Sequence, residues 1–206
     1  MEIIIASTNI HKIREYRAML KSLRAFDVMS LHDFPTYIPE EEVGSSFEEI
    51  VSKKALHAAK TIGKLVLADD SGLVVPALGG APGVYSARYA GINATDKENR
   101  MKLLFEMKDL QEADRFSYLE CCIALATPEG QVKSVKAISE GIILSEERGS
   151  NGFGYDSVFL KHDYSKTFAE LEEETKNRIS HRRKAFDKIK LTLETLVEDS
   201  LLYRRV

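Results

Sequence analysis

The sequence predicts an α/β protein built on a mixed β-sheet. In its first half, short apolar runs typical of buried strands alternate with helical patterns; in its second half, two long strand-like runs precede a helical C-terminal third. The chain of 206 residues is long enough for a substantial hydrophobic core, and it contains no repeat and no low-complexity linker. We therefore expect one domain over residues 1–206.

The first expected element is a strand at residues 3–6, a continuous apolar run that suits burial on both faces. The polar residues 7–9 end this strand, and apolar side chains at helical spacing over residues 13–23 predict a helix after it. Residues 26–31 predict a second strand. The chain thus opens with a strand, a polar turn, a helix and a strand.

An acidic loop at residues 40–42 comes before the next predicted helix. Ser46 and Glu49 have the spacing of a capping box, which predicts the start of that helix. Residues 65–68 then predict a short buried strand, and the polar residues 69–72 are expected to end it abruptly. Apolar character resumes just beyond them.

A glycine-rich loop is expected at residues 79–83, and Thr95 with Glu98 predicts a second capping box and helix. The long runs at residues 116–127 and 131–144 are joined by Pro-Glu-Gly and predict an antiparallel hairpin. A further glycine-rich loop precedes the last helix, which has this apolar stripe: Ile179, Phe186, Ile189, Leu193, Leu196 and Val197.

Composition excludes several classes of protein. The formal net charge of −3 argues against bulk attraction to nucleic acid or to anionic membranes. No apolar stretch is long enough to span a bilayer, and the start of the chain does not look like a secretory leader, so we expect a cytoplasmic protein. Cys121 and Cys122 are neighbours on a predicted strand and point to opposite faces, which favours buried structural thiols over a disulfide or a metal pair.

Asp69 and Asp70 are the first candidates for chemistry. Two carboxylates at the carboxyl end of a buried strand are costly unless a positive group is present, and a divalent cation commonly fills that role. Ligands also bind in the crevice outside the carboxyl ends of strands in open α/β sheets. An aspartate-rich turn without a site is the alternative, since Asp, Ser and Gly are turn formers.

The residues after the first strand predict an anion site. Small polar residues that lead into a helix expose backbone N–H groups at its N-terminus, and Lys12 adds a positive charge one turn later. The glycines of a P-loop are missing, and a capped helix with a surface lysine is the alternative. The residues of this candidate site are Ser7, Thr8, Asn9 and Lys12, with Ile10 and His11 between them in the chain.

Two later segments have the features of a nucleotide site. Phe153 lies between two glycines, where the backbone can approach a ligand and the ring can stack on a base, although a tight turn with core aromatics is the alternative. Positive groups at the start of the last helix oppose its dipole, a local cost that functional sites sometimes carry. The remaining candidates are Arg88, Gly154, Tyr155, Asp156, His181 and Arg182. Together with a carboxylate metal site, these segments indicate a nucleoside triphosphate bound with magnesium.

The same segments, in the same order, resemble the inosine triphosphate pyrophosphatase family, also called non-canonical purine triphosphate pyrophosphatases. The resemblance covers residues 7–182, which is most of the chain. It rests on the motifs Ser-Thr-Asn with Lys12, Glu41 ahead of Phe47, Ala-Asp-Asp-Ser-Gly-Leu at 68–73, Gly-Gly-Ala-Pro-Gly at 79–83 with Tyr-Ser-Ala-Arg-Tyr at 85–89, Gly-Phe-Gly-Tyr-Asp at 152–156, Lys176 and Ser-His-Arg at 180–182.

The resemblance implies an elongated mixed sheet with flanking helices and two lobes around a central nucleotide cleft, usually in a homodimer. It implies Mg²⁺-dependent cleavage of ITP, dITP and XTP between the α- and β-phosphates. Glu41, Asp70 and Asp69 would form the metal site, with Asp70 as the proton acceptor for the attacking water. Residues 7–12, Lys54 and Ser71 would contact phosphate. Phe153 would stack on the purine, and the surrounding base and ribose contacts would be Asp156, Lys176, His181 and Arg182.

This chain departs from the family pattern at two positions. Ile50 replaces a usual asparagine after the acidic loop, and Ser157 replaces the proline that usually follows Gly-Tyr-Asp. A related pyrophosphatase acting on modified pyrimidines or on ordinary triphosphates is the alternative among enzymes. A nucleotide-binding sensor without hydrolysis is the alternative from another class.

Overall fold

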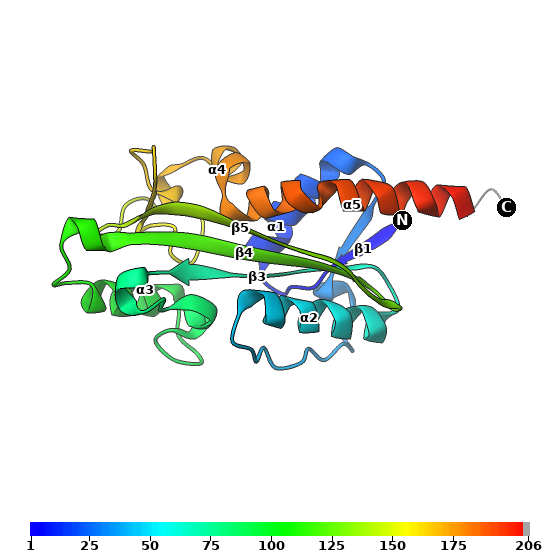
Figure 1. The fold of residues 1–206 in the computed structure, drawn as a ribbon, viewed down its shortest axis with the longest axis horizontal. Helices are drawn as coiled ribbons and strands as arrows, with labels where there is room; N and C mark the ends of the chain where they lie inside the picture. The colour runs from blue at the N-terminus through cyan, green and yellow to red at the C-terminus, as the bar shows by residue number, and fades with distance from the viewer. Residues whose placement is uncertain (204–206) are drawn as a thin grey trace. The chain divides into compact units, whose positions relative to one another are not determined.

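The computed structural model describes the backbone of residues 1–203 and the side chains of residues 1–199. One six-stranded sheet has the order β2-β1-β3-β4-β5-β6, with helices beside it (Figure 1). The strands are β1 (Glu2–Ile5), β2 (Asp27–Ser30), β3 (Val66–Val74), β4 (Phe116–Thr127), β5 (Gly130–Ile143) and β6 (Phe159–Lys161). The α-helices are α1 (Ile10–Leu20), α2 (Phe47–Ile62), α3 (Asp96–Glu106), α4 (Glu173–Ile179) and α5 (His181–Tyr203).

The sheet is mixed, which confirms the predicted fold class. Strand β1 pairs in parallel with both β2 and β3, whereas β5 pairs antiparallel with β6. Strands β4 and β5 are neighbours joined by only two residues, as predicted for a hairpin. The chain divides into two compact units, the first comprising residues 1–70, 122–136 and 183–206 and the second residues 71–121 and 137–182.

The first unit follows from the handedness of strand connections. Helix α1 connects β1 to β2 on one side of it, and α2 connects β2 back past β1 to β3 on the other side. The two connections run in opposite directions across the sheet, so if both are right-handed, α1 and α2 must lie on opposite faces. Figure 1 shows this arrangement, with α2 on one side of the strands and α1 with α5 on the other. Because both faces are covered, Ile3, Ile4 and Ile5 are almost completely buried.

The second unit has its own hydrophobic core. Side chains from β3, α3, β4 and β5 meet side chains of the segment after β5, and Phe159 packs edge-on against Phe168 with ring centroids 5.2 Å apart. The other members of this core are Leu73, Val75, Leu103, Met107, Leu119, Ile143, Tyr155, Val158 and Leu171. This core supports both α3 and the loop that carries Phe153.

Two local expectations differ from the structure, and one strand was not expected. Strand β3 does not end at Asp69 but runs unbroken to Val74, because pairing with its neighbours outweighs the turn preference of Asp and Gly. Ser46 caps α2 by accepting from Glu49 N–H, but the Glu49 carboxylate binds the N–H and hydroxyl of Ser45, so only half of the predicted capping box forms. The short strand β6 had no counterpart in the sequence analysis.

Other expectations are confirmed. Both halves of the capping box of Thr95 and Glu98 are present at the start of α3. Cys121 and Cys122 are buried in β4. Within the part of the chain that the structure describes, no helix combines the length and the apolar character needed to cross a membrane.

Candidate functional site

Three carboxylates and two lysines gather in the first unit, and we call them the carboxylate–lysine cluster. Its members are Lys12, Glu42, Lys54, Asp69 and Asp70. Four elements contribute them: β3 carries both aspartates, α1 carries Lys12, α2 carries Lys54, and the loop before α2 carries Glu42. Lys12 Nζ lies 3.2 Å from Asp69 Oδ2, and Lys54 Nζ lies 2.5 Å from Glu42 Oε1.

Asp70 is a strongly perturbed acid of this cluster. Burial raises the pKa of its carboxyl group to about 6; the ammonium of Lys12 opposes that rise, and the charge of Glu42 adds to it. The pKa of Glu42 is lowered, because the neighbouring Lys54 ammonium outweighs the effect of burial. A carboxyl group with a raised pKa is a better proton acceptor near neutral pH than an ordinary aspartate.

The donor set of the cluster fits a hard divalent cation. With every group ionised, three carboxylates against two ammonium groups leave one net negative charge, and carboxylate oxygens are the ligands that Mg²⁺ prefers. Among the described residues, no group of three or more His, Cys, Asp or Glu side chains is placed to hold a metal ion by itself.

The start of α1 supports a modified form of the predicted anion site. Asn9 caps the helix, and its Oδ1 accepts from the N–H groups of His11 and Lys12. Ser7 is buried and its hydroxyl accepts from Asn9 N–H, while the carbonyl of Thr8 contacts His32 Nε2 at 3.1 Å. The side chain of Asn9 therefore occupies these two N–H groups, and the ammonium of Lys12 in the first turn pairs with Asp69. Ile10 is 65% exposed.

The acidic loop places Glu42 in the cluster, whereas the sequence analysis selected Glu41. The Glu42 side chain, which is 40% exposed, pairs with Lys54 and acts on the pKa of Asp70; the side chain of Glu41 is exposed as well. The loop runs close over α2, since a Cβ on Gly44 would lie 2.7 Å from Ile50 Cγ1. Ile50 is therefore a buried packing residue beneath the loop, and nothing in the sequence distinguished Glu42 from its acidic neighbours.

A second group, the aromatic–cation cluster, lies in the second unit and comprises Ser71, Phe153, Asp156, Lys176 and Arg182. Lys176 Nζ lies 2.6 Å from Asp156 Oδ2 and 4.6 Å from the centre of the Phe153 ring. The guanidinium carbon of Arg182 lies 5.7 Å from the same centre, and its Nη2 donates to Ser71 Oγ at 2.8 Å. Both cations are almost fully buried, so the partly exposed ring has positive charge beside it.

The glycine before Phe153 is required by the turn itself. Gly152 has φ +74°, and a Cβ there would overlap the Asp156 carboxylate, whose Oδ2 accepts from Phe153 N–H at 2.9 Å. Asp156 was expected to bind base or ribose, but this oxygen holds Lys176 and the Phe153 backbone. A glycine at position 152 thus lets the Asp156 carboxylate approach the backbone. The sequence had instead suggested that the glycine lets a ligand approach.

The remaining predicted residues also have defined places in the second unit. Tyr155 is buried and its hydroxyl donates to the Ser86 carbonyl. The guanidinium carbon of Arg88, in a short 3₁₀ helix, lies 5.3 Å from the centre of the Tyr85 ring. His181 is the first residue of α5 and is 5% exposed. Lys176, on α4, and Arg182, on α5, were both predicted, and the structure brings them to Phe153.

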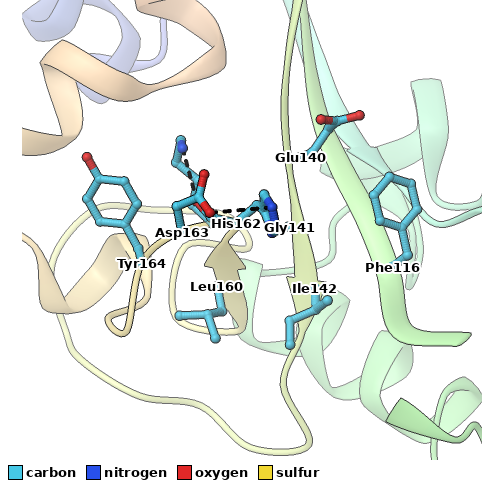
Figure 2. A pocket seen from close by; sticks show the side chains of 9 residues that line it. Phe116, Glu140, Gly141, Ile142, Leu160, His162, Asp163 and Tyr164 are labelled. Atoms are coloured by element: carbon cyan, nitrogen blue, oxygen red, sulfur yellow. Dashed lines mark hydrogen bonds and ion pairs between the residues drawn. The ribbon is translucent and has the colours of Figure 1, made fainter. Parts of the chain in front are cut away.

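A pocket of about 350 Å³ lies elsewhere in the second unit, where β5 pairs with β6 (Figure 2). Mainly apolar groups line it, and two of its lining residues, His162 and Asp163, lie on the exposed surface with His162 Nε2 3.4 Å from Asp163 Oδ1. Its lining residues are Phe116, Glu140, Gly141, Ile142, Leu160, Lys161, His162, Asp163 and Tyr164. Because this set includes none of the residues discussed above, we assign the pocket no part in the candidate chemistry.

The fold and the two clusters define an α/β protein that combines a carboxylate–lysine centre with an aromatic–cation centre. The model of the Ham1 family matches residues 3–192, and the chain belongs to that family. A dITP/XTP pyrophosphatase of Protochlamydia amoebophila is 57% identical over 197 residues, covering 95% of this chain and 99% of the relative. One of Chlamydia abortus is 52% identical over 99% of this chain and its own full length. The solved Staphylococcus aureus Ham1 protein superposes with a TM-score of 0.83 at 40% identity, covering 95% of this chain and 99% of that structure.

Proposed function

We propose that this protein hydrolyses purine nucleoside triphosphates with abnormal bases, namely ITP, dITP and XTP, to the nucleoside monophosphate and pyrophosphate. The observation that carries the proposal is the carboxylate–lysine cluster, in which a buried carboxyl group with a raised pKa stands among two ammonium groups and two further carboxylates. The names of the relatives from Protochlamydia and Chlamydia agree with this activity. Removing such triphosphates would keep them out of the nucleotide pool.

Glu42 and Asp70 are the side chains we assign to Mg²⁺, with Asp69 beside them. When bound, the cation would neutralise phosphate charge and polarise the scissile phosphorus. Lys12 and Lys54 neutralise further phosphate oxygens and stabilise the charge that develops on the leaving pyrophosphate. Asp70 orients the attacking water and accepts its proton, the role that its raised pKa supports.

The aromatic–cation cluster suits recognition of the base. The Phe153 ring offers a stacking surface, and Lys176 and Arg182 present only hydrogen-bond donors. Donors reward the keto oxygen at C6 of hypoxanthine and xanthine, whereas the amino group of adenine would face them unpaired. His181 stands beside Arg182 in the chain, and we assign it to the same recognition. Asp156 contributes by holding Lys176 and the Phe153 backbone in place.

A survey of triphosphates tests the substrate class. With Mg²⁺ present, kcat/KM for ITP and XTP should exceed that for GTP by more than about tenfold, the equivalent of about 1.4 kcal/mol in the barrier. A smaller preference, or a preference for modified pyrimidines, would contradict the assignment. A nucleotide-binding sensor would release no pyrophosphate with any of these substrates, and Asp70→Asn should abolish the release.

We further propose that the protein acts as a homodimer in the cytoplasm, as the family resemblance implies. Buried thiols at Cys121 and Cys122 are compatible with a reducing compartment. Light scattering coupled to gel filtration measures the mass in solution, and twice the chain mass of 23.2 kDa is the expected value. A mass of one chain at micromolar concentration would refute the dimer.

A further inference from the structure

Helix α3 holds the loop that carries Phe153 through both backbone groups of Gly154. Gly154 N–H donates to Asp96 Oδ2 at 2.7 Å, and Arg100 Nη1 donates to the Gly154 carbonyl at 2.8 Å. Asp96 and Arg100 are one turn apart on the same helix, so they reach the same residue from one side. None of the roles assigned above uses either side chain.

These contacts determine the direction of the Phe153 side chain. The peptide before Phe153 is fixed by the bond from its N–H to Asp156 Oδ2 at 2.9 Å, and the peptide after it is fixed by the bond to Asp96. Because peptide groups are planar, fixing the peptides on either side of a Cα leaves its Cα–Cβ bond one direction. Arg100 holds the following peptide and prevents the turn from rotating at Gly154, which has φ +60°.

Arg100 is itself held in one orientation. Its Nε donates to Glu147 Oε2 at 2.9 Å, and the Ser157 hydroxyl donates to the same oxygen at 2.9 Å. The guanidinium thus bridges a carboxylate and a carbonyl, a task that suits its rigid planar fork and that a lysine ammonium performs poorly. The hydroxyl of Ser157 thus joins the same network.

The helix is a firm support for this loop. The capping box of Thr95 and Glu98 fixes its first turn, and Leu103 is fully buried in the core of the second unit. A capped and packed helix has little backbone freedom, so the side chains that project from it hold the loop from a fixed base.

We propose that Asp96 and Arg100, supported by Glu147 and Ser157, are positioning residues that set the Phe153 ring for the purine. The inference rests on the proposed function, in which Phe153 stacks on the base. It deepens that function by placing part of base recognition in α3. Loosening the loop should therefore weaken binding of the base and leave the chemistry at the phosphates nearly unchanged.

A double-mutant cycle with ITP tests the coupling. Arg100→Ala and Asp96→Ala should each raise KM by about five- to tenfold, with kcat changed by less than about twofold. Combined with Phe153→Ala, either substitution should cause no further rise, because the ring it positions is gone. Melting temperatures of all variants establish that they are folded at the assay temperature.

Conservative variants separate positioning from general support of the fold. Asp96→Asn keeps an acceptor oxygen for Gly154 N–H and should restore most of the wild-type KM, whereas Asp96→Ala should not. Arg100→Lys keeps the charge but cannot bridge both partners, so its KM should stay high. Lys97→Ala changes an exposed charge on the same helix and is the matched control. If Arg100→Ala fails to fold, Arg100→Lys and Ser157→Ala take its place in the cycle.

The outcomes distinguish a failure of the positioning role of α3 from a failure of the proposed stacking of Phe153 on the base. If Phe153→Ala leaves the KM for ITP unchanged, stacking on Phe153 is wrong and the inference falls with it. If Phe153→Ala raises KM but the α3 substitutions do not, the inference alone is wrong. The inference alone is also wrong if the rises in KM caused by the α3 substitutions multiply with the rise caused by Phe153→Ala. It is likewise wrong if Asp96→Asn changes kcat and KM together to the same extent as Asp96→Ala.

Discussion

Asp70 lies where burial and nearby carboxylates disfavour its ionised form, and its pKa rises from 3.8 to about 6. Because the folded pKa is above the unfolded value, ionisation of this group opposes folding. The cost is absent below about pH 4, grows between about pH 4 and pH 6, and is fully present at neutral pH in the metal-free protein. Functional groups often carry a local cost of this kind.

Asp70→Asn should therefore stabilise the metal-free protein while it abolishes activity. In EDTA at pH 7.5, we expect the free energy of unfolding to rise by up to about 3 kcal/mol, and the difference from wild type should vanish near pH 4. Urea denaturation at the two pH values measures both quantities. Equal destabilisation at pH 7.5 and pH 4 would show that the carboxylate is not disfavoured in the fold.

Glu42 and Glu41 provide a matched pair for testing the metal site. Glu42→Gln should raise the Mg²⁺ concentration needed for half-maximal activity by about tenfold or more, because a ligand oxygen loses its charge. Glu41→Gln should behave as wild type, since Glu42 is the glutamate that pairs with Lys54. The opposite pattern in a magnesium titration would restore the assignment made from sequence.

At the scale of elements, the features that depend on contacts between residues close together in the chain were predictable from the sequence. Thr95 with Glu98 predicted the start of α3, because a cap is a contact over three residues. The continuity of β3 was not predictable, since strands far along the chain supply its pairing partners. The contacts of Asp96 and Arg100 with Gly154 span 58 and 54 residues, so no local pattern reveals them.

The turn before Phe153 gives a prediction for an element. Gly152→Ala should destabilise the protein by about 1–3 kcal/mol, because φ is +74° and the added Cβ would displace the Asp156 carboxylate. The displaced carboxylate would also release Lys176, so the KM for ITP should rise. Thermal melts and steady-state kinetics measure the two effects. Gly63→Ala, at the end of α2 with the same φ of +74° and open space around it, is the comparison that separates φ strain from the overlap.

At the scale of the whole molecule, the mixed sheet was predictable from the alternation of buried runs and helices. The types of residue in the site were also predictable. Two carboxylates directly after a buried apolar run, a lysine one turn into a helix and an aromatic residue between two glycines each indicate a candidate binding group. The burial of individual side chains was not predictable, and a surface lysine was therefore one interpretation of Lys12. Which of the three consecutive glutamates joins the carboxylate–lysine cluster depends on the position of Lys54, which only the structure gives. Consecutive residues of β3, Asp70 and Ser71, belong to the two clusters.

The central claim is that the bond between the α- and β-phosphates of an abnormal purine triphosphate is cut with the help of Mg²⁺. Its most direct test is the identification of products after incubation with ITP and Mg²⁺, by ion-exchange chromatography and a phosphate assay. We predict IMP and pyrophosphate in equal amounts, with neither formed in EDTA or by Asp70→Asn. Orthophosphate with IDP would contradict the account, because the β–γ bond would then be the one cleaved.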